Sequence, residues 1–371
     1  MSNDPFSERS SRPHTDGLFS REEVQLANRN SGLLLEALRH DVTPIGLHYL
    51  LNHFDIPYVT SMDWQIAIDG KVARPRVLTL TDILRLPQQT LRVTLECAGN
   101  GRANISPRYQ SMPWMLEAVG TAEWTGTPLR IVLEEAGLAD DAVEVVFTGA
   151  DRGFDRGSEH AFARSLTRDV ALSSDALLVH AMNGLPLAPQ HGYPLRLVVP
   201  GWYGMASVKW LTRIEAVSAP FRGHQQVGTY VYRERPGGPG IPVTHLRVRS
   251  LMAPPGMPDF YSRRRMVDAG RIPLMGRAWS GDGVPVTRVQ VGIDGVWHDA
   301  DLDPLAGRYA WRGWTFGWDA TPGTYDLTCR AEDASGQIQP LDARWDNGGF
   351  GNNAVQHVSV TVRAPVASQG A

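Results

Sequence analysis

The chain has 371 residues, of which 42% are apolar and 20% charged, and its formal net charge is −3 at pH 7. This length favours two or three domains with buried cores, and the charge gives no indication of nucleic-acid binding. Two cysteines are too few for a disulfide framework or for an iron–sulfur cluster, which takes about four thiolates. No apolar run approaches the ~18 residues of a membrane span.

The N-terminal residues carry no visible targeting signal. Residues 1–15 are polar, and no apolar stretch follows paired arginines. We therefore expect a cytoplasmic protein, or a periplasmic one if a leader has been removed. Residues 1–40 are expected to form a flexible arm through residue 19 and then a short helix. That helix is predicted because Ser20-Arg21-Glu22-Glu23 has the form of a capping box.

A strand is expected at 64–70, and a short helix at 79–86 ends before a proline. In the next strand, Leu91 to Cys97, apolar residues alternate with polar ones, as in a strand with one buried face. Cys97 is thus delivered at a strand end, and the glycines at 99 and 101 allow a sharp turn or close approach to a bound group. Such a cysteine can be a metal ligand, a nucleophile or a small buried hydrophobe, and taken alone it is most often the last.

The middle of the chain combines one helix with two buried strands. The helix is predicted with Thr127 at its N-cap and Pro128 at its first position, and Gly137 ends it. A strand over 143–147 runs into a turn that contains Asp151, and a strand over 195–200 enters a loop with two glycines, a serine and a lysine. Backbone N–H groups and one cation in such a loop can hold an anion, although this sign is weak by itself.

The segment 235–242 is rich in proline and glycine and is the clearest linker in the chain. Beyond it, short alternating strands and an Asp294-Gly295 hairpin turn predict an immunoglobulin-like β-sandwich. Cys329 lies in an inward-facing row there and is most simply a core residue. The basic triplet Arg263-Arg264-Arg265 is more often solvated surface, but it can also face a phosphate or a partner.

The segment Glu96-Cys97-Ala98-Gly99-Asn100, followed by Arg102, resembles the molybdenum-ligating segment of the sulfite oxidase family. The resemblance extends roughly from Asp41 to Val362. It implies an α+β fold: a mixed molybdopterin domain over 41–235, followed by an all-β immunoglobulin-like domain over 243–365 that makes a homodimer. It also implies molybdenum and molybdopterin as cofactors, with Cys97 as the single protein thiolate on the metal. A thiolate is the soft ligand that such a metal prefers.

The same resemblance implies a set of site residues. Expected pterin contacts are Tyr49, Asn52, His53, Asp151, His191, Arg196, Ser207, Val208 and Lys209. Of these, His191 and Arg196 belong to a His-Gly-x-Pro-x-Arg segment and, with Ser207 and Lys209, are expected at the phosphate end of the pterin. Trp124 resembles the active-site tryptophan of the family, and Arg102 is expected near the metal. Taken alone, each histidine would more often be an ordinary hydrogen-bonded residue, Asp151 a turn residue and Trp124 a core residue.

Three positions depart from the family pattern around a sulfite pocket. Leu51 and Val284 stand where arginines are expected, and Gly101 replaces the arginine beside Arg102. The family tyrosine aligns loosely with Phe221 or Arg222. Each charge-assisted contact to a buried anion contributes about 1.5–3 kcal/mol, so these losses matter for anion binding. Other arginines can compensate, and the candidates are Arg152, Arg156 and Arg222.

Three functions remain open. The leading one is oxygen-atom transfer to sulfite, a small-molecule substrate, with electrons passed to a separate acceptor that is cytochrome c-like or of another kind. A separate partner is expected because residues before 41 leave no room for a haem domain. The second is a reductive enzyme of the same fold that acts, for example, on a sulfoxide or nitrate. The third is a β-sandwich binding or scaffold protein whose cofactor pocket is vestigial.

Overall fold

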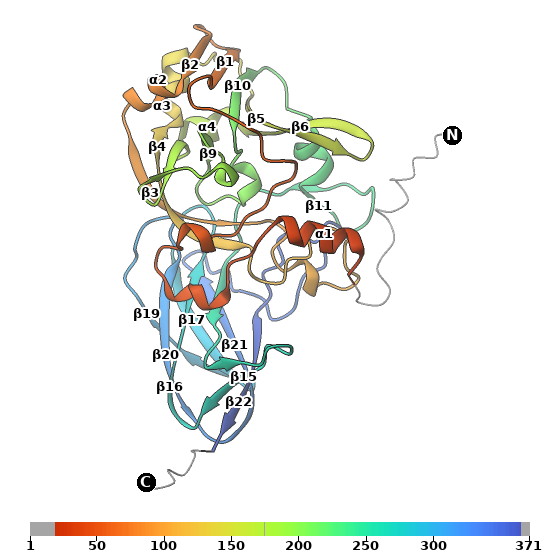
Figure 1. Ribbon diagram of the computed structural model, residues 1–371, viewed down its shortest axis with the longest axis vertical. Coiled ribbons are helices and arrows are strands. Elements are labelled where there is room, and N and C mark those ends of the chain that lie inside the picture. The colour runs from red at the N-terminus through yellow and green to blue at the C-terminus, as the bar shows by residue number, and fades with distance from the viewer. Residues whose placement is uncertain (1–18, 174, 365–371) are drawn as a thin grey trace, which may run out of the picture.

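Two parts stacked end to end make up the elongated structure, a computed structural model that describes residues 19–173 and 175–364. A mixed α+β part forms one end and a β-sandwich the other, as expected (Figure 1). The predicted arm over 1–19 lies, except for its last residue, outside the described residues. None of the described helices is long and apolar enough to cross a membrane.

The mixed part contains two five-stranded sheets. The first has the order β2-β1-β10-β5-β6, and the second runs β3-β4-β7-β8 with β9 also paired to β7. The first sheet consists of β1 (Gln65–Gly70), β2 (Arg76–Thr79), β5 (Glu144–Asp155), β6 (Ser158–Thr167) and β10 (Leu211–Val217). The second consists of β3 (Gln89–Glu96), β4 (Val119–Pro128), β7 (Leu177–Met182), β8 (Leu185–Pro186) and β9 (Arg196–Val198).

Short helices connect and cover these strands. They are α1 (Arg21–Arg29), α2 (Leu80–Arg85), α3 (Leu129–Ala136), α4 (Arg168–Ser173), the 3₁₀ helices η2 (Leu35–Arg39), η3 (Ile45–Leu47), η4 (Arg102–Asn104), η5 (Pro189–His191) and η6 (Gly204–Ala206), and the π-helix η7 (His224–Thr229). The capping box at α1 is confirmed, since Ser20 and Glu23 exchange side-chain and backbone hydrogen bonds.

The predicted start of the helix over 127–137 is wrong by one residue. Thr127 and Pro128 are the last residues of β4, and Pro128, without a side-chain cap, precedes the first helical residue. Thr127 instead donates its hydroxyl to the Ile83 carbonyl at 3.1 Å, so its side chain ties the strand to α2. Gly137 ends the helix in the left-handed region (φ 72°), as expected.

The sandwich packs two sheets, ordered β13-β16-β20-β19 and β14-β15-β22-β21-β17-β18. Its strands are β13 (Arg249–Ala253), β14 (Met257–Pro258), β15 (Arg265–Asp268), β16 (Gly270–Trp279), β17 (Val286–Ile293), β18 (Val296–Asp299), β19 (Asp301–Leu302), β20 (Arg312–Ala320), β21 (Gly323–Asp333) and β22 (Gln356–Arg363). The hairpin at Asp294-Gly295 is confirmed between β17 and β18, and Cys329 is fully buried in the core.

Two segments differ in structure from what the sequence predicts. The predicted linker over 235–242 is partly ordered, because β12 (Ile241–Pro242) pairs with β11 (Val231–Tyr232) as a small hairpin. The basic triplet is divided: Arg265 is buried and pairs with Glu36 at 2.5 Å, whereas Arg263 is more than half exposed. Glu36 lies on η2, so the triplet helps hold the N-terminal segment against the sandwich.

Truncating Leu327 tests whether the sandwich core contributes to global stability. Leu327 is fully buried between the two sheets, so Leu327→Ala removes apolar contacts and leaves a cavity. We expect the free energy of unfolding to fall by about 2–5 kcal/mol. The control is Val296→Ala, because Val296 is 60% exposed at the start of β18 and should change stability by less than about 0.5 kcal/mol. Equal losses in denaturant unfolding would contradict this packing.

Candidate active site

Cys97 lies where the sequence predicts it, directly after β3 and at the base of a cavity. Its backbone N–H donates to the Ala118 carbonyl at 2.9 Å, and its side chain packs with Met112 and Trp114. Gly101 adopts φ 89° in the turn that follows. A Cβ at Gly99 would lie 2.5 Å from Arg102 Nη2, so the guanidinium group can lie against the turn only because residue 99 is glycine.

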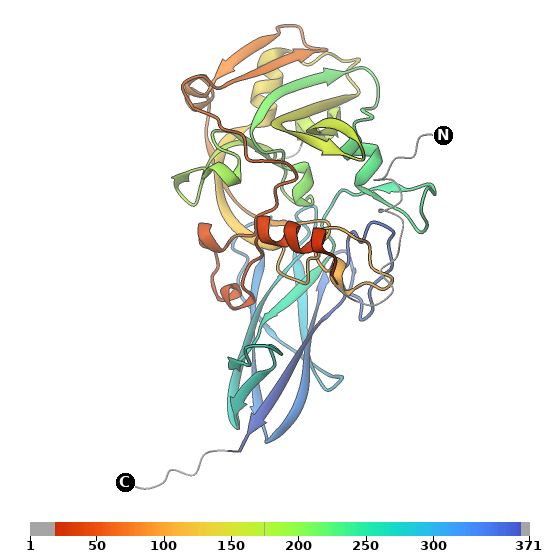
Figure 2. The ribbon, with the colours of Figure 1, turned by 45° about the vertical axis from the view of Figure 1, so that its right-hand side comes forward.

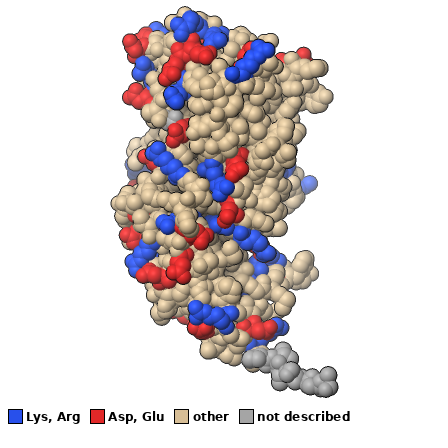
Figure 3. Space-filling view, turned by 90° about the vertical axis from the view of Figure 1, so that its left-hand side faces the viewer, with Lys and Arg blue, Asp and Glu red and all other residues tan. Residues whose placement is uncertain are grey.

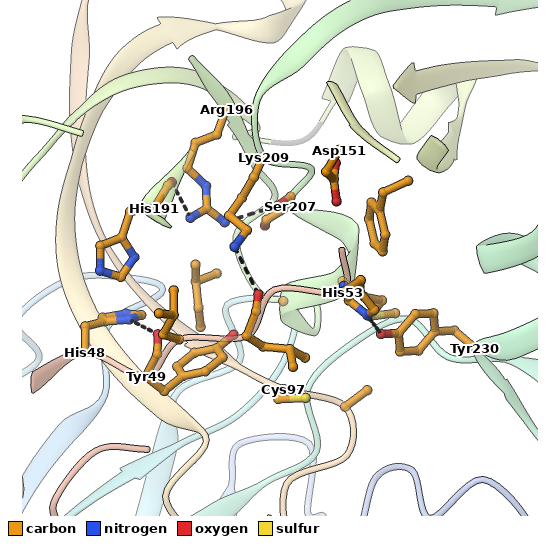
Figure 4. Close-up of a pocket in the computed structure, with 17 residues that line it drawn as sticks. His48, Tyr49, His53, Cys97, Asp151, His191, Arg196, Ser207, Lys209 and Tyr230 are labelled. Carbon is orange, nitrogen blue, oxygen red and sulfur yellow. Dashed lines mark hydrogen bonds between the residues drawn. The ribbon is translucent and has the colours of Figure 1, made fainter. Parts of the chain in front are cut away.

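The cavity has an empty volume of about 640 Å³, which includes space open to solvent. Residues from both sheets and from the loops between them line it: His48, Tyr49, Leu50, Leu51, His53, Leu95, Cys97, Ala98, Asp151, Phe162, His191, Arg196, Gly204, Met205, Ser207, Lys209 and Tyr230. Figure 4 shows Cys97 on one wall and Arg196, Lys209 and Asp151 on the opposite wall. The cavity therefore has a sulfur end and a charged end.

Two cations occupy the charged end without an acidic partner. Arg196 donates to the carbonyls of His191 at 3.0 Å and Ser207 at 3.1 Å, and Lys209 Nζ donates to the carbonyls of Leu51 and Gln190, each at 3.0 Å. No ion pair joins either cation to a carboxylate within residues 19–173 and 175–364. Burial lowers the pKa of Arg196 to about 10, and burial together with Arg196 lowers that of Lys209 well below its usual range. A ligand that brings an anion would relieve this penalty.

Asp151 adds an unsatisfied acceptor to the same end. Its Oδ1 is buried and has no hydrogen-bond partner among the described residues. Burial raises the pKa of this carboxyl to about 6, although Lys209 opposes the shift. A Cβ at Gly149 would lie 2.5 Å from Asp151 Oδ1 and 2.6 Å from the Lys209 carbonyl oxygen, so the backbone can approach here only because residue 149 is glycine. Asp151 is thus positioned to accept a hydrogen bond from a ligand N–H.

Two neutral histidines separate the ends. His191 follows Pro189 in η5, and its ring lies edge-on to that of His48, with centroids 5.7 Å apart. Burial is the main cause that lowers the pKa of His48 to about 4 and that of His191 to about 3, and Arg196 contributes to both shifts. Both imidazoles are therefore neutral near pH 7. His48 Nδ1 lies 3.1 Å from the Tyr49 carbonyl and donates to it, which leaves Nε2 as an acceptor without a partner among the described residues.

Tyr230 faces the sulfur end and was not found from the sequence. Its hydroxyl lies 2.5 Å from His53 Nε2, and the Arg164 guanidinium carbon lies 5.6 Å from the centroid of its ring. Phe221 and Arg222, with which the family tyrosine aligns loosely, do not line this cavity, whereas Tyr230 does. Burial raises the Tyr230 pKa above its usual range, opposed by Arg102 and Arg164. The π-helix η7 directly before Tyr230 has no sequence signature that would have revealed this placement.

Arg164 was also missed, but a signal for it exists in the sequence. It stands between Phe162 and Leu166 at an inward position of the alternating strand β6. Its side chain is buried, donates to the Gln225 carbonyl and leaves Nε without a partner among the described residues. Of the arginines considered for compensation, Arg152 is instead exposed and pairs with Glu159. A charged residue on the buried face of a strand was the indication that this cation is held inside the fold, although Arg164 does not itself line the cavity.

Four predicted site residues do not line the cavity. Val208 lies in the core, with its N–H bonded to Ala206 and its carbonyl to Leu197. Asn52 supports the site from behind, since its side-chain oxygen accepts from Lys209. Trp124 lies behind Arg196, whose guanidinium carbon is 4.9 Å from its ring centroid. Arg102 donates to the Gly348 carbonyl at 2.9 Å and to the Met112 carbonyl at 3.2 Å.

The residue before Cys97 ties the site to the sandwich. Glu96 is buried and forms an ion pair with Arg249 at 2.6 Å. Its Oε2 accepts from Trp279 Nε1 at 2.9 Å, and Asn100 Nδ2 donates across the turn at 3.0 Å to Oε1, the oxygen that also pairs with Arg249. Arg249 and Trp279 belong to β13 and β16 of the sandwich, so the second part of the chain fixes the strand end that presents the sulfur.

The residues present fit the pterin cofactor that the sequence resemblance implies. Its phosphate needs cations, which Arg196 and Lys209 supply without carboxylate partners. Its ring N–H groups need an acceptor, and Asp151 Oδ1 has no other partner. A metal at the other end needs a soft ligand, and Cys97 faces the cavity there. The cavity therefore suits an elongated, anionic, nitrogen-rich ligand that reaches from the cations to the sulfur.

Comparisons with known families agree with this geometry. Residues 53–225 match the family described as the oxidoreductase molybdopterin binding domain, and residues 242–363 match the Mo-co oxidoreductase dimerisation domain. The match to the first spans the residues on both sides of the cavity, from His53 to Lys209.

Individual relatives differ in the activity that their names record. The mitochondrial sulfite oxidase of Drosophila melanogaster is 31% identical over 89% of the chain and 61% of its own length, and nitrate reductase [NADH] 2 of Phaseolus vulgaris is 30% identical over 89% and 41%. The chain thus spans less than half of that nitrate reductase. The crystal structure of the sulfane dehydrogenase SoxCD from Paracoccus pantotrophus superimposes with a TM-score of 0.77 at 25% identity, covering 96% of this chain and 95% of that one.

Replacing Trp279 tests the link between Glu96 and the cysteine. Trp279→Phe removes the N–H that donates to Glu96 Oε2, so the free energy of unfolding should fall by about 1–3 kcal/mol. In cofactor-free protein, iodoacetamide should then alkylate Cys97 several-fold faster. The matched control is Trp314→Phe, which removes an equally buried indole donor that bonds to Ser250 instead. Equal alkylation rates in both variants would show that Trp279 does not position the cysteine.

Replacing Asp151 tests the unsatisfied carboxylate. The folded-state pKa is raised to about 6 from 3.8, so ionisation opposes folding above pH 6 and not below pH 4. Cofactor-free Asp151→Asn should therefore gain up to about 2–3 kcal/mol in unfolding free energy at pH 7 and little at pH 4. The same variant should retain less pterin after purification. A gain that is the same at both pH values would contradict burial of the charge as the cause.

Proposed function

Because the chain belongs to the sulfite oxidase and nitrate reductase family of molybdopterin-binding oxidoreductases, we propose that it oxidises sulfite to sulfate by oxygen-atom transfer and passes two electrons to a separate acceptor. The observation that carries the proposal is the two-ended cavity, with unpaired cations at one end and a sulfur ligand beside a tyrosine–histidine pair at the other. Molybdenum held there would supply the two-electron redox chemistry that side chains lack.

The residues of the chain have separate roles in this proposal. Arg196 and Lys209 hold the phosphate of the cofactor, and Asp151 accepts from its pterin ring. Cys97 binds the metal as a thiolate and does not act as a nucleophile. Burial raises the pKa of its thiol and Arg102 opposes that shift, so metal binding together with Arg102 keeps the sulfur deprotonated.

At the sulfur end an anionic substrate would meet the Tyr230 hydroxyl in the cavity wall, with two buried arginines behind that wall. Tyr230 is held by His53 and lies against Arg164, and Arg102 is fixed near Cys97 by the carbonyl of Gly348. These groups supply a hydroxyl donor and two positive charges within the surroundings of the metal position. They support an oxyanion such as sulfite even though Leu51 and Val284 stand where arginines are expected.

Reduction of a sulfoxide or nitrate is the second candidate, and Leu51 is the observation that favours it. Leu51 lines the cavity and packs against the cluster that contains Cys97, so it makes the wall near the sulfur apolar, which suits a less charged substrate better than a dianion. Relatives named nitrate reductase match the chain as well as those named sulfite oxidase do. A vestigial pocket in a scaffold protein is less consistent with buried, unpaired cations, which destabilise the fold unless a ligand compensates them.

The sandwich matches a dimerisation domain, and we propose that the chain forms a homodimer through it. Light scattering of the cofactor-loaded protein at low micromolar concentration should therefore give a mass of about twice the 40.8 kDa of one chain. The cytoplasm is the compartment we propose for it.

The proposed reaction is tested by measuring the metal and pterin content per chain and, on the same sample, sulfite turnover with a dye as electron acceptor. Stoichiometric metal without turnover would exclude sulfite and leave the second candidate.

Replacing each cysteine in turn tests the ligand assignment. Cys97→Ser should keep the fold and lower turnover at least about 100-fold, because a neutral hydroxyl is a poor ligand for a soft metal. It should also change the electron paramagnetic resonance spectrum of the reduced metal. The control is Cys329→Ser, since Cys329 is fully buried in the sandwich and its loss should affect stability alone. Full activity in Cys97→Ser would contradict the assignment.

A further inference from the structure

A second hollow, which we call the junction groove, lies between the β11–β12 hairpin and the sandwich loop 344–350. Its empty volume is about 1470 Å³, and four arginines line it: Arg233, Arg235, Arg247 and Arg344. Figure 2 shows the hairpin and this loop next to each other at the side of the molecule, where the two parts meet.

The junction groove has a formal net charge of +2, because four arginines line it against two acidic residues, Glu234 and Asp346. Glu234 lies 3.6 Å from Arg344, and Asp346 accepts from the backbone N–H groups of Arg233 at 2.7 Å, Gly348 at 2.9 Å and Phe350 at 3.0 Å. The whole chain, by contrast, carries a net charge of −3, and on the face drawn in Figure 3 acidic and basic side chains are mixed. A groove with four arginines is therefore a local exception that favours an anionic partner.

The inner wall of the groove touches the active site. Phe350 lines the groove, and its ring centroid lies 5.2 Å from that of Tyr230 and 5.1 Å from the guanidinium carbon of Arg102. The next residue, Gly351, donates its N–H to the carbonyl of Ala98 at 2.7 Å. A single hydrogen bond thus connects the wall of the groove to the residue that follows Cys97.

We propose that the junction groove docks the acidic face of a one-electron carrier protein, which receives electrons from the site across Phe350 and Gly351. This inference rests on the proposed oxidation of sulfite, because only an oxidase needs an electron acceptor. Each carrier takes up one electron, so the two electrons released per sulfite reduce two carriers in succession. Electron-transfer contacts are small, short-lived and guided by charge, which suits exposed arginines beside a half-buried Trp345 and an exposed Ile241.

The test measures electron transfer directly and does not depend on the substrate. Molybdenum-loaded protein is reduced with titanium(III) citrate, freed of reductant, and mixed with an acidic or a basic c-type cytochrome while haem reduction is followed. At low ionic strength the acidic cytochrome should react at least about tenfold faster, and its rate should fall as salt screens the charges. Failure of sulfite turnover leaves this measurement intact, so the two proposals can fail separately.

Charge reversal then locates the contact. Arg235→Glu with Arg344→Glu should slow the acidic cytochrome at least about tenfold. The control, Arg85→Glu with Arg130→Glu, changes the net charge equally on the exposed surfaces of α2 and α3, far from the groove (Figure 1), and should keep the rate within about twofold. If the reversed variant fails to load molybdenum, Arg344→Gln replaces it, with an expected loss of about threefold.

Three outcomes would overturn the proposal. The first is equal rates with the two cytochromes in the unchanged protein. The second is a rate in the groove variant that matches the control, since net charge and not the groove would then govern association. The third is a change in oligomeric state in the groove variant, which would assign the groove to a contact between copies of the chain.

Discussion

The buried carboxylate of Glu96 is the constraint on which the site depends. It is the last residue of β3, and its two oxygens are held by Arg249, Trp279 and Asn100. Removing two charges from water costs free energy that their attraction only partly returns, so this pair is a poor source of stability. Its effect is geometric. It fixes the end of one strand relative to the sandwich. Because Cys97 directly follows Glu96, this contact also fixes the position of Cys97.

The cavity reflects the opposite situation, because its charges are left without protein partners. Arg196 and Lys209 are bound to carbonyl oxygens, and Asp151 keeps an oxygen unsatisfied. Each of these groups weakens the empty fold, since burial opposes a charge that nothing compensates. The remaining chain must offset this cost, and the continuous core that includes Val208, Trp279 and Trp311 from both parts does so. Stabilising apolar contacts thus surround the site, whereas the buried charged groups of the site itself lack protein partners.

Sequence patterns predicted those features that depend on local periodicity. The strand over Leu91 to Cys97 is confirmed, but its single buried face is not: Thr94 and Glu96 are as buried as Val93 and Leu95, because the sandwich part covers them. The sandwich strands and the Asp294-Gly295 hairpin are confirmed, because alternating burial leaves a direct mark on residue order. Contacts between distant segments were harder. Tyr230 reaches the cavity after a π-helix whose register no residue pattern reveals, and Val208 packs in the apolar core between residues that do line the cavity. Arg164 was readable as a cation on a buried strand face, but only the fold brings it to Tyr230.

The sandwich, which matches a dimerisation domain, also shapes the site. Its residues Arg249 and Trp279 hold Glu96, and its loop residues Gly348 and Phe350 fix Arg102 and face Tyr230. The same loop forms one wall of the junction groove. One short segment therefore contacts the substrate end of the cavity on one side and a charged external surface on the other. Phe350, which is buried, is the residue that the wall of the groove and the surroundings of Arg102 have in common.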